Sequence, residues 1–181
     1  MPAVIPAAAA LAAASAVFEA LCFLSPAAKA ERKKAAGGFL AGAAFVLLFG
    51  YMGRQIGTLP PDSIAGYAGI TAVISGAVRI AKLILRRVSF EPGGGTDEKT
   101  VFQLSAALTV QRCVCTLSVT PIRGAVTWIS AAVFAAAVLT GGIVLRAGTP
   151  AAGCAARKAS YLVTALICAA CGISSLINGL L

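Results

Sequence analysis

The feature that most constrains this chain is a series of six long apolar stretches, each bounded by charged residues, proline or glycine. A helix needs about 20 apolar residues to cross the hydrocarbon core of a bilayer. Hydrophobic residues make up 59% of the sequence and charged residues only 12%, a balance that soluble domains rarely reach. The sequence therefore predicts six transmembrane helices, at about residues 3–24, 35–53, 64–85, 101–121, 124–146 and 158–180.

Each stretch is predicted to be an α-helix, because a segment inside lipid must pair its backbone polar groups internally. None of the stretches shows the strict alternation of polar and apolar residues that marks the strand of a membrane barrel. Alanine and glycine are abundant within the stretches, and small residues allow membrane helices to pack closely. The expected fold class is therefore all-α, a polytopic membrane protein.

Lysine and arginine are distributed unevenly between the loops that connect these helices. The only basic residues of loops two and four are Arg54 and Arg123, whereas loops one, three and five contain ten basic residues together. Basic residues in short loops stay in the cytoplasm, so both termini are predicted to lie outside, in the plasma membrane of a prokaryote. We therefore interpret the net charge of +9 as a signal of orientation in the membrane and not as a surface that binds nucleic acid. The basic residues of the odd-numbered loops are Lys29, Arg32, Lys33, Lys34, Arg86, Arg87, Lys99, Arg146, Arg157 and Lys158.

The polar loop at residues 86–100, RRVSFEPGGGTDEKT, divides the chain into two halves of three predicted helices each. An odd number of helices places the halves in opposite orientations, as in transporters built from inverted repeats. A constant offset of 93 residues also aligns two segments, VFEALCFLSP and VQRCVCTLSVTP. We therefore expect one transmembrane domain over residues 1–181, with repeat one at 1–85 and repeat two at 101–181.

Charged and amide side chains inside the predicted helices are the strongest functional signal, because burying them in lipid is costly. Glu19 lies within the first predicted helix, and Gln111 and Arg112 lie midway along the fourth. The repeat places Glu19 and Arg112 at equivalent depths, so these residues are predicted to form a substrate or ion site at the repeat interface. The alternative is an ion pair that only holds the two helices together. Arg79 and Lys82 are expected to reach the cytoplasmic surface from the end of the third helix.

Six cysteines allow a second chemistry. Cys22 and Cys115 are matched by the repeat and would meet across its pseudo-twofold axis, a geometry that suits a thiol-disulfide relay or a soft-metal site. Cys168 and Cys171 lie one helical turn apart and are interpreted as small packing residues. The redox hypothesis therefore depends on Cys22 and Cys115.

Two features that many enzymes depend on are missing from the sequence. It contains no histidine, which is the commonest general base and metal ligand. It also contains no Walker loop, so hydrolysis of ATP by this chain is excluded. We therefore expect a protein that is not an enzyme and has no permanently bound cofactor.

Several features together resemble the MntP-type manganese efflux pumps of the LysE superfamily: the length, the six-helix plan, the segment GGFLAGAAFVLLFGYMGRQIG, the short charged central loop and the ending ARKASYLVTALICAACGISSLINGL. The resemblance implies acidic ion-binding residues in the first and fourth helices. Glu19 occupies the first of these positions, whereas Gln111 or Arg112 stands at the second, where an aspartate is expected. Ala43 or Ala44 stands where the second helix of the family carries an acid.

Two further families share part of this pattern. A basic RKK segment before the second helix and the ending NGL resemble MarC proteins of the same superfamily. The two repeat-matched cysteines, Cys22 and Cys115, are similar to those of the CcdA and DsbD membrane relays, although the Pro-Cys motifs of those proteins are missing.

The expected function is therefore a secondary transporter that exports a small cation or solute from the cytoplasm. The resemblance implies Mn²⁺ or another divalent cation as the transported ion, with Glu19 as a metal ligand. The alternatives are a thiol relay through Cys22 and Cys115, and a family member that no longer transports. The expected partners are the lipid bilayer, the transported solute and, given the small size of the chain, a second copy in a homodimer.

Overall fold

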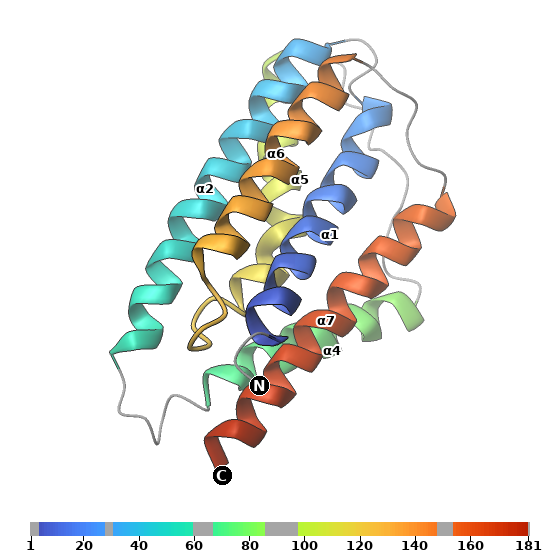
Figure 1. The fold of residues 1–181 in the computed structure, drawn as a ribbon. Coiled ribbons are helices and arrows are strands. Elements are labelled where there is room, and N and C mark those ends of the chain that lie inside the picture. Colours follow the sequence, from blue (N-terminus) through green and yellow to red (C-terminus); the bar gives the residue numbers. More distant parts are fainter. Residues whose placement is uncertain (1–3, 28–30, 60–66, 86–97, 148–153, 181) are drawn as a thin grey trace.

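The computed structural model describes residues 4–27, 31–59, 67–85, 98–147 and 154–180. Six α-helices occupy these residues, which confirms the all-helical class (Figure 1). They are α1 (Val4–Ala27), α2 (Arg32–Thr58), α4 (Ala68–Ile84), α5 (Glu98–Leu117), α6 (Trp128–Ala147) and α7 (Cys154–Leu180). Most of the predicted central loop lies outside the described residues.

Four of the six helices are long and apolar enough to cross a membrane: α1, α2, α6 and α7. The apolar part of α5 is shorter, at Val101–Leu117. Helix α4 has 17 residues, so it is about 26 Å long against a hydrocarbon core of about 30 Å. The fold is thus compatible with a membrane protein, and the prediction of full-length spans holds for four helices.

The end of α5 and the start of α6 differ from the prediction, which had a helix continuing to residue 121 and another starting at 124. Helix α5 ends at Leu117, because Pro121 has no backbone N–H and disfavours helix in the residue before it. Helix α6 starts only after Thr127, whose hydroxyl accepts a hydrogen bond from the Ser130 N–H at 3.3 Å. The Ser130 hydroxyl accepts one from the Thr127 N–H at 2.8 Å, which completes a reciprocal cap.

Helix α1 lies at the centre of the bundle (Figure 1). It packs against α5, α6 and α7, whereas α2 packs against α5 and α6, and α4 packs mainly against α7. Helices α4 and α7 therefore lie on the opposite side of α1 from α2 (Figure 1). This arrangement buries one side of the middle of α1 against other helices, whereas Phe18 on its other side is exposed.

Small residues allow the two tightest helix pairs to approach closely. Between α2 and α5, a Cβ atom added at Gly42 would lie 2.7 Å from the Ala106 carbonyl oxygen, and one added at Gly38 would collide with the Phe102 carbonyl. Between α4 and α7, a Cβ atom added at Gly76 would lie 2.7 Å from the Ala165 carbonyl oxygen. In both pairs, backbone therefore lies against backbone.

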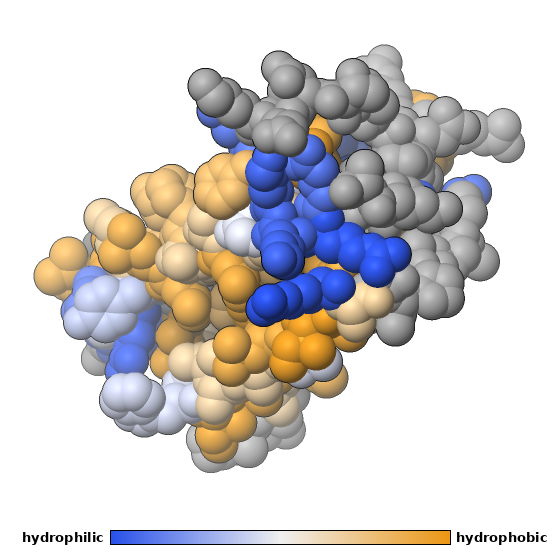
Figure 2. Space-filling model, turned by 90° about the horizontal axis from the view of Figure 1, so that it is seen from above, coloured by the Kyte–Doolittle hydropathy of each residue, from blue (hydrophilic) through white to orange (hydrophobic). Residues whose placement is uncertain are grey.

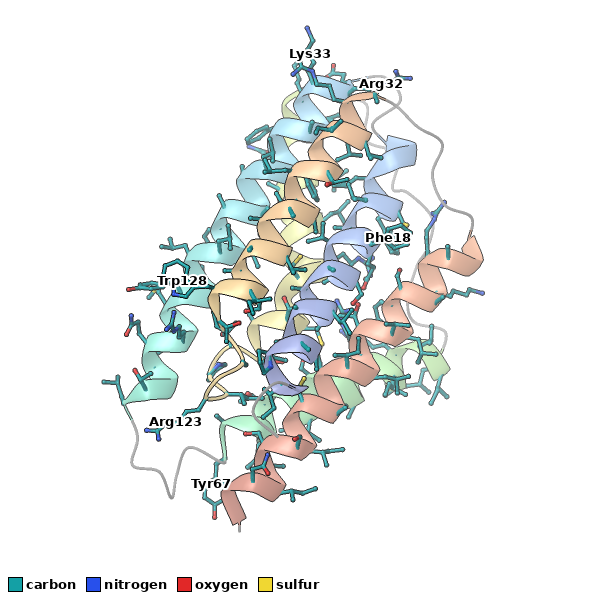
Figure 3. The ribbon with its side chains drawn as sticks, viewed as in Figure 1. Phe18, Arg32, Lys33, Tyr67, Arg123 and Trp128 are labelled. Atoms are coloured by element: carbon teal, nitrogen blue, oxygen red, sulfur yellow. The ribbon has the colours of Figure 1, made fainter. Side chains whose placement is uncertain are left out.

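The two ends of the bundle differ in charge. Seen from the end where α2 starts, a cluster of hydrophilic residues lies beside apolar surface (Figure 2). Arg32 and Lys33 project from this end, whereas Arg123 lies towards the other end and Trp128 lies beside the second half of α2 (Figure 3). Lys34 is also exposed at this end, and the exposed Arg146 lines a shallow cavity together with Lys33.

Candidate functional site

The site forms around Glu19, the only carboxylate buried within the described part of the chain. Its exposed fraction is 0%. Its neighbours on the buried face of α1, Ala16 and Ala20, are equally buried. Small side chains at these positions allow other helices to approach α1 and bring long polar side chains to the carboxylate.

Two arginines from different helices bind this carboxylate. Arg79 of α4 donates a hydrogen bond from Nη1 to Glu19 Oε2 at 3.0 Å, and Arg112 of α5 donates from Nη1 to Glu19 Oε1 at 3.4 Å. Arg79 also donates from Nη2 to the Arg112 backbone carbonyl at 2.6 Å. The side chains of Arg79 and Arg112 are only 10% and 11% exposed. We call Glu19, Arg79 and Arg112 the charged triad.

An aromatic ring lies against each guanidinium group. Arg79 Cζ lies 4.7 Å from the centre of the Tyr161 ring on α7, and Arg112 Cζ lies 3.7 Å from the centre of the Phe23 ring on α1. Both distances are within the range of cation–π attraction. The rings stabilise positive charge inside the bundle without neutralising it.

The charged triad carries a formal net charge of +1, because one carboxylate faces two guanidinium groups. Both carboxylate oxygens of Glu19 are engaged. The Nε atom of Arg112 is buried and has no hydrogen-bond partner among the described residues. The site therefore has an excess of positive charge and of hydrogen-bond donors, which an oxyanion would satisfy.

The structure brings together two of the three predicted site residues. Glu19 and Arg112, which the repeat places at equivalent depths, form an ion pair, and their role as a substrate site stays a prediction. Gln111 is exposed on the outside of α5, so the structure does not bring it to the buried carboxylate. Arg112, the next residue in the sequence, points inward because neighbouring positions on a helix face different directions.

Arg79 does not reach the cytoplasmic surface, where the sequence predicted it. It is instead buried and bound to Glu19. The signal was present in α4, where Ala72, Gly76 and Arg79 follow one another at helical spacing on a single buried face. The position of Arg79 near the end of α4 suggested the membrane surface. The side chain nevertheless points inward, because Arg79 lies on the buried face of the helix. Lys82, one turn later, is exposed as expected.

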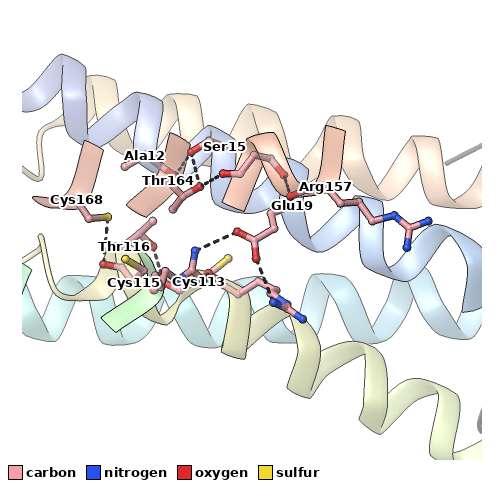
Figure 4. A network of polar contacts seen from close by, with 12 residues as sticks. Ala12, Ser15, Glu19, Cys113, Cys115, Thr116, Arg157, Thr164 and Cys168 are labelled. Atoms are coloured by element: carbon pink, nitrogen blue, oxygen red, sulfur yellow. Dashed lines mark hydrogen bonds and ion pairs between the residues drawn. The ribbon is translucent and has the colours of Figure 1, made fainter. Parts of the chain in front are cut away.

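Both cysteines of the redox prediction, Cys22 and Cys115, are buried and form no disulfide in the structure. The relay through this pair therefore stays a prediction from the sequence. Cys115 neighbours Cys168, whose thiol donates to the Cys115 carbonyl oxygen at 3.5 Å (Figure 4). All five cysteines with described side chains are free.

A hydroxyl bridge fixes α1 against α7 near the charged triad (Figure 4). The hydroxyl groups of Ser15 and Thr164 lie 2.8 Å apart and share a hydrogen bond. Thr164 also donates to the Ser160 carbonyl oxygen at 2.8 Å. The bridge places Tyr161, one turn from Thr164, beside Arg79.

The donors around the charged triad do not form a metal site. Among the described residues there is no group of three or more histidine, cysteine, aspartate and glutamate side chains that could hold a metal ion. Divalent cations such as Mn²⁺ prefer several hard oxygen ligands. Glu19 supplies two oxygens, and both already accept hydrogen bonds from arginines. The arrangement therefore suits an anionic group better than a dication.

Comparison with known proteins adds no family to this description. No protein-family model, curated protein or solved structure matches the chain. The membership of the LysE superfamily therefore stays a prediction from the sequence. The charged triad is the observation from which a function can be argued.

Proposed function

We propose that the chain is an integral membrane secondary transporter that exports a small solute bearing a carboxylate or another oxyanion. Glu19, Arg79 and Arg112 form its binding site. The observation that carries this proposal is the net charge of +1 inside a bundle of apolar helices. An ionisable side chain within a membrane helix is costly, and such residues commonly line transport pathways.

The two ion pairs of Glu19 support an exchange mechanism. The Arg79 contact is 3.0 Å long and the Arg112 contact 3.4 Å, so the second pair is the weaker. An incoming oxyanion would bind Arg112, including its unpartnered Nε–H, while Glu19 remains paired with Arg79. Glu19 thus occupies the place of the substrate when the site is empty, which avoids an unpaired buried cation.

The packing of the helices supports alternating access between two inverted repeats. Helix α1 packs against α6, and its counterpart α5 packs against α2, the counterpart of α6. Glu19 and Arg112, which the repeat matches, contact each other. One departure from the symmetry is that α1 packs broadly on α7 whereas α5 barely contacts α4. Nearly all of the larger helix contacts join one repeat to the other. Alternating access would therefore require helices of the two repeats to slide against each other around the charged triad, which would expose it to each side in turn.

The distribution of charge supports a cytoplasmic location for the end where α2 starts. Arg32, Lys33 and Lys34 are exposed there. The opposite end has Arg54 and Arg123. The positive-inside rule then places both termini outside, and fusions of a reporter to each terminus test this orientation.

Transport by purified protein in liposomes tests the proposed function. Accumulation of labelled small carboxylates, inorganic oxyanions and Mn²⁺ is measured under an imposed membrane potential and under a proton gradient. We expect accumulation of at least one anion, and its loss in Arg112→Gln. Because Glu19 keeps Arg79 in this variant, the fold should persist while the excess charge is removed.

The control variant is Arg146→Gln, which removes an exposed arginine at the end of α6 and should leave anion transport unchanged. Accumulation of Mn²⁺ in place of every anion would overturn the proposed substrate class in favour of the cation expected from the family resemblance. Absence of movement of all tested solutes in either gradient would overturn the transporter assignment.

A further inference from the structure

A second site lies between α1, α2, α5 and α6, away from the charged triad. It is a cavity of about 250 Å³ whose walls include Ala9 and Ala12 of α1, Leu47 of α2, Leu117 of α5 and Phe134 of α6. Glu19, Arg79 and Arg112 do not line it. Its walls are mostly apolar, and its polar residues include Arg54 and Thr127, so the greater part of it suits a hydrocarbon group.

The mouth of this cavity is charged. Arg54 and Trp128 line the apolar cavity and also an adjoining cavity of about 270 Å³, where Arg123 joins them. Trp128 is 87% exposed and lies beside the second half of α2, as Figure 3 shows. Exposed tryptophans and arginines at one end of a membrane bundle mark the level of the lipid headgroups.

The two cavities together match an amphiphile with an anionic head. A hydrocarbon chain fits the apolar walls, while a phosphate at the mouth would meet two guanidinium groups and the hydroxyl of Thr127. Each basic residue near a lipid surface favours an anionic headgroup by about fivefold. We infer that this cavity binds one acyl chain of an acidic phospholipid, whose phosphate is bound by Arg54 and Arg123.

This inference rests on the membrane location of the chain and not on transport. The cavity lies at the end of the bundle opposite Arg32 and Lys33 (Figure 3). The lipid would hold α1, α2, α5 and α6 together at that end. Loss of the bound lipid and loss of solute binding at the charged triad can therefore be measured separately.

Trp128 is the only tryptophan in the chain and provides the test. The full-length protein is placed in phosphatidylcholine vesicles that contain a minority of acyl-brominated lipid, either phosphatidylglycerol or phosphatidylcholine. Bromine quenches tryptophan fluorescence only at short range. We expect brominated phosphatidylglycerol to quench Trp128 at roughly 25-fold lower mole fraction than brominated phosphatidylcholine, because two arginines each contribute about fivefold.

Three variants separate the parts of the site. Arg54→Gln combined with Arg123→Gln should bring the two brominated lipids to equal quenching. Ala131→Leu, which fills part of the cavity wall, should weaken quenching by phosphatidylglycerol. Ala132→Leu is the matched control, because its exposed side chain does not line the cavity, and it should behave as the unaltered protein.

The outcome that overturns the inference is equal quenching by both lipids in the unaltered protein. Competition by inorganic phosphate alone, at ordinary ionic strength, would also overturn it, because the site would then recognise a free anion and not a lipid. Retention of the lipid preference in Ala131→Leu would show that the chain is bound elsewhere. None of these results depends on whether the protein transports a solute.

Discussion

Two contacts between helices hold this bundle together by opposite means. The α2–α5 contact is made of backbone lying on backbone at Gly38 and Gly42, within the apolar part of the bundle. The contact of α1 with α4 and α5 at the charged triad is made of one carboxylate and two guanidinium groups. Close apolar packing has no substitute once it is opened, whereas an ion pair can be replaced by another ion. The first contact therefore suits a permanent frame, and the second suits a joint that a substrate can open.

Of the changes that separate these two contacts, removal of the Glu19 carboxylate should lower the free energy of unfolding most. Glu19→Gln leaves Arg79 and Arg112 buried without a counter-ion, so the free energy of unfolding should fall by about 3–5 kcal/mol. Denaturation in mild detergent measures this change. The double variant Glu19→Gln with Arg79→Gln should recover part of the loss. A loss in the double variant equal to the sum of both single losses would show that the residues do not interact.

The α2–α5 contact should respond to a single methyl group. Gly38→Ala places a Cβ atom against the Phe102 carbonyl and should reduce the free energy of unfolding by about 1–3 kcal/mol. The matched control is the neighbouring Gly37→Ala, whose Cβ atom would lie 3.5 Å from the Phe102 ring, at ordinary contact distance. This control should be neutral or more stable by up to about 1 kcal/mol. Equal effects of the two variants would contradict the proposed frame.

The aromatic support of Arg112 should give a smaller effect. Phe23→Leu removes the ring that lies 3.7 Å from the guanidinium carbon, and the coupling between Phe23 and Arg112 should be about 0.5–2 kcal/mol. A double-mutant cycle with Arg112→Gln measures this coupling. Zero coupling would show that Phe23 contributes packing alone.

The surface offers an ion pair for comparison with the buried one. Lys34 and Glu31 are 3.3 Å apart and their side chains are 44% and 24% exposed. Lys34→Gln should change the free energy of unfolding by less than about 0.5 kcal/mol, because exposed pairs gain little over water. A loss as large as that of Glu19→Gln would show that burial does not set the strength of these pairs.

The sequence was sufficient to predict the helices and the central ion pair. Apolar length identified every described helix, and the offset between the repeats paired Glu19 with Arg112. These features depend on composition and on matching positions, which can be counted along the chain. They require no knowledge of which helix packs on which.

The rest of the site depends on helix packing, which apolar length does not encode. Arg79 was missed because its position near the end of α4 predicted the surface, whereas the small residues around it turn that face inward. Gln111 was included because it adjoins Arg112, yet it lies on another face. The relay pair, Cys22 and Cys115, was expected from the repeat alone, and both of its thiols are free in the structure. A helical-wheel analysis of small residues would have corrected the first two errors.

The central claim, that the charged triad binds an anion, is tested most directly by thermal unfolding of the purified protein with added ligands. The panel contains small carboxylates, inorganic oxyanions and MnCl₂, and it is repeated with Arg112→Gln. A ligand at 100 times its dissociation constant stabilises a protein by about 2.7 kcal/mol, which gives a clear rise in the midpoint. The account predicts that an anion raises the midpoint, that Mn²⁺ does not, and that Arg112→Gln abolishes the rise. Stabilisation by Mn²⁺ alone, strengthened by Arg112→Gln, would contradict it.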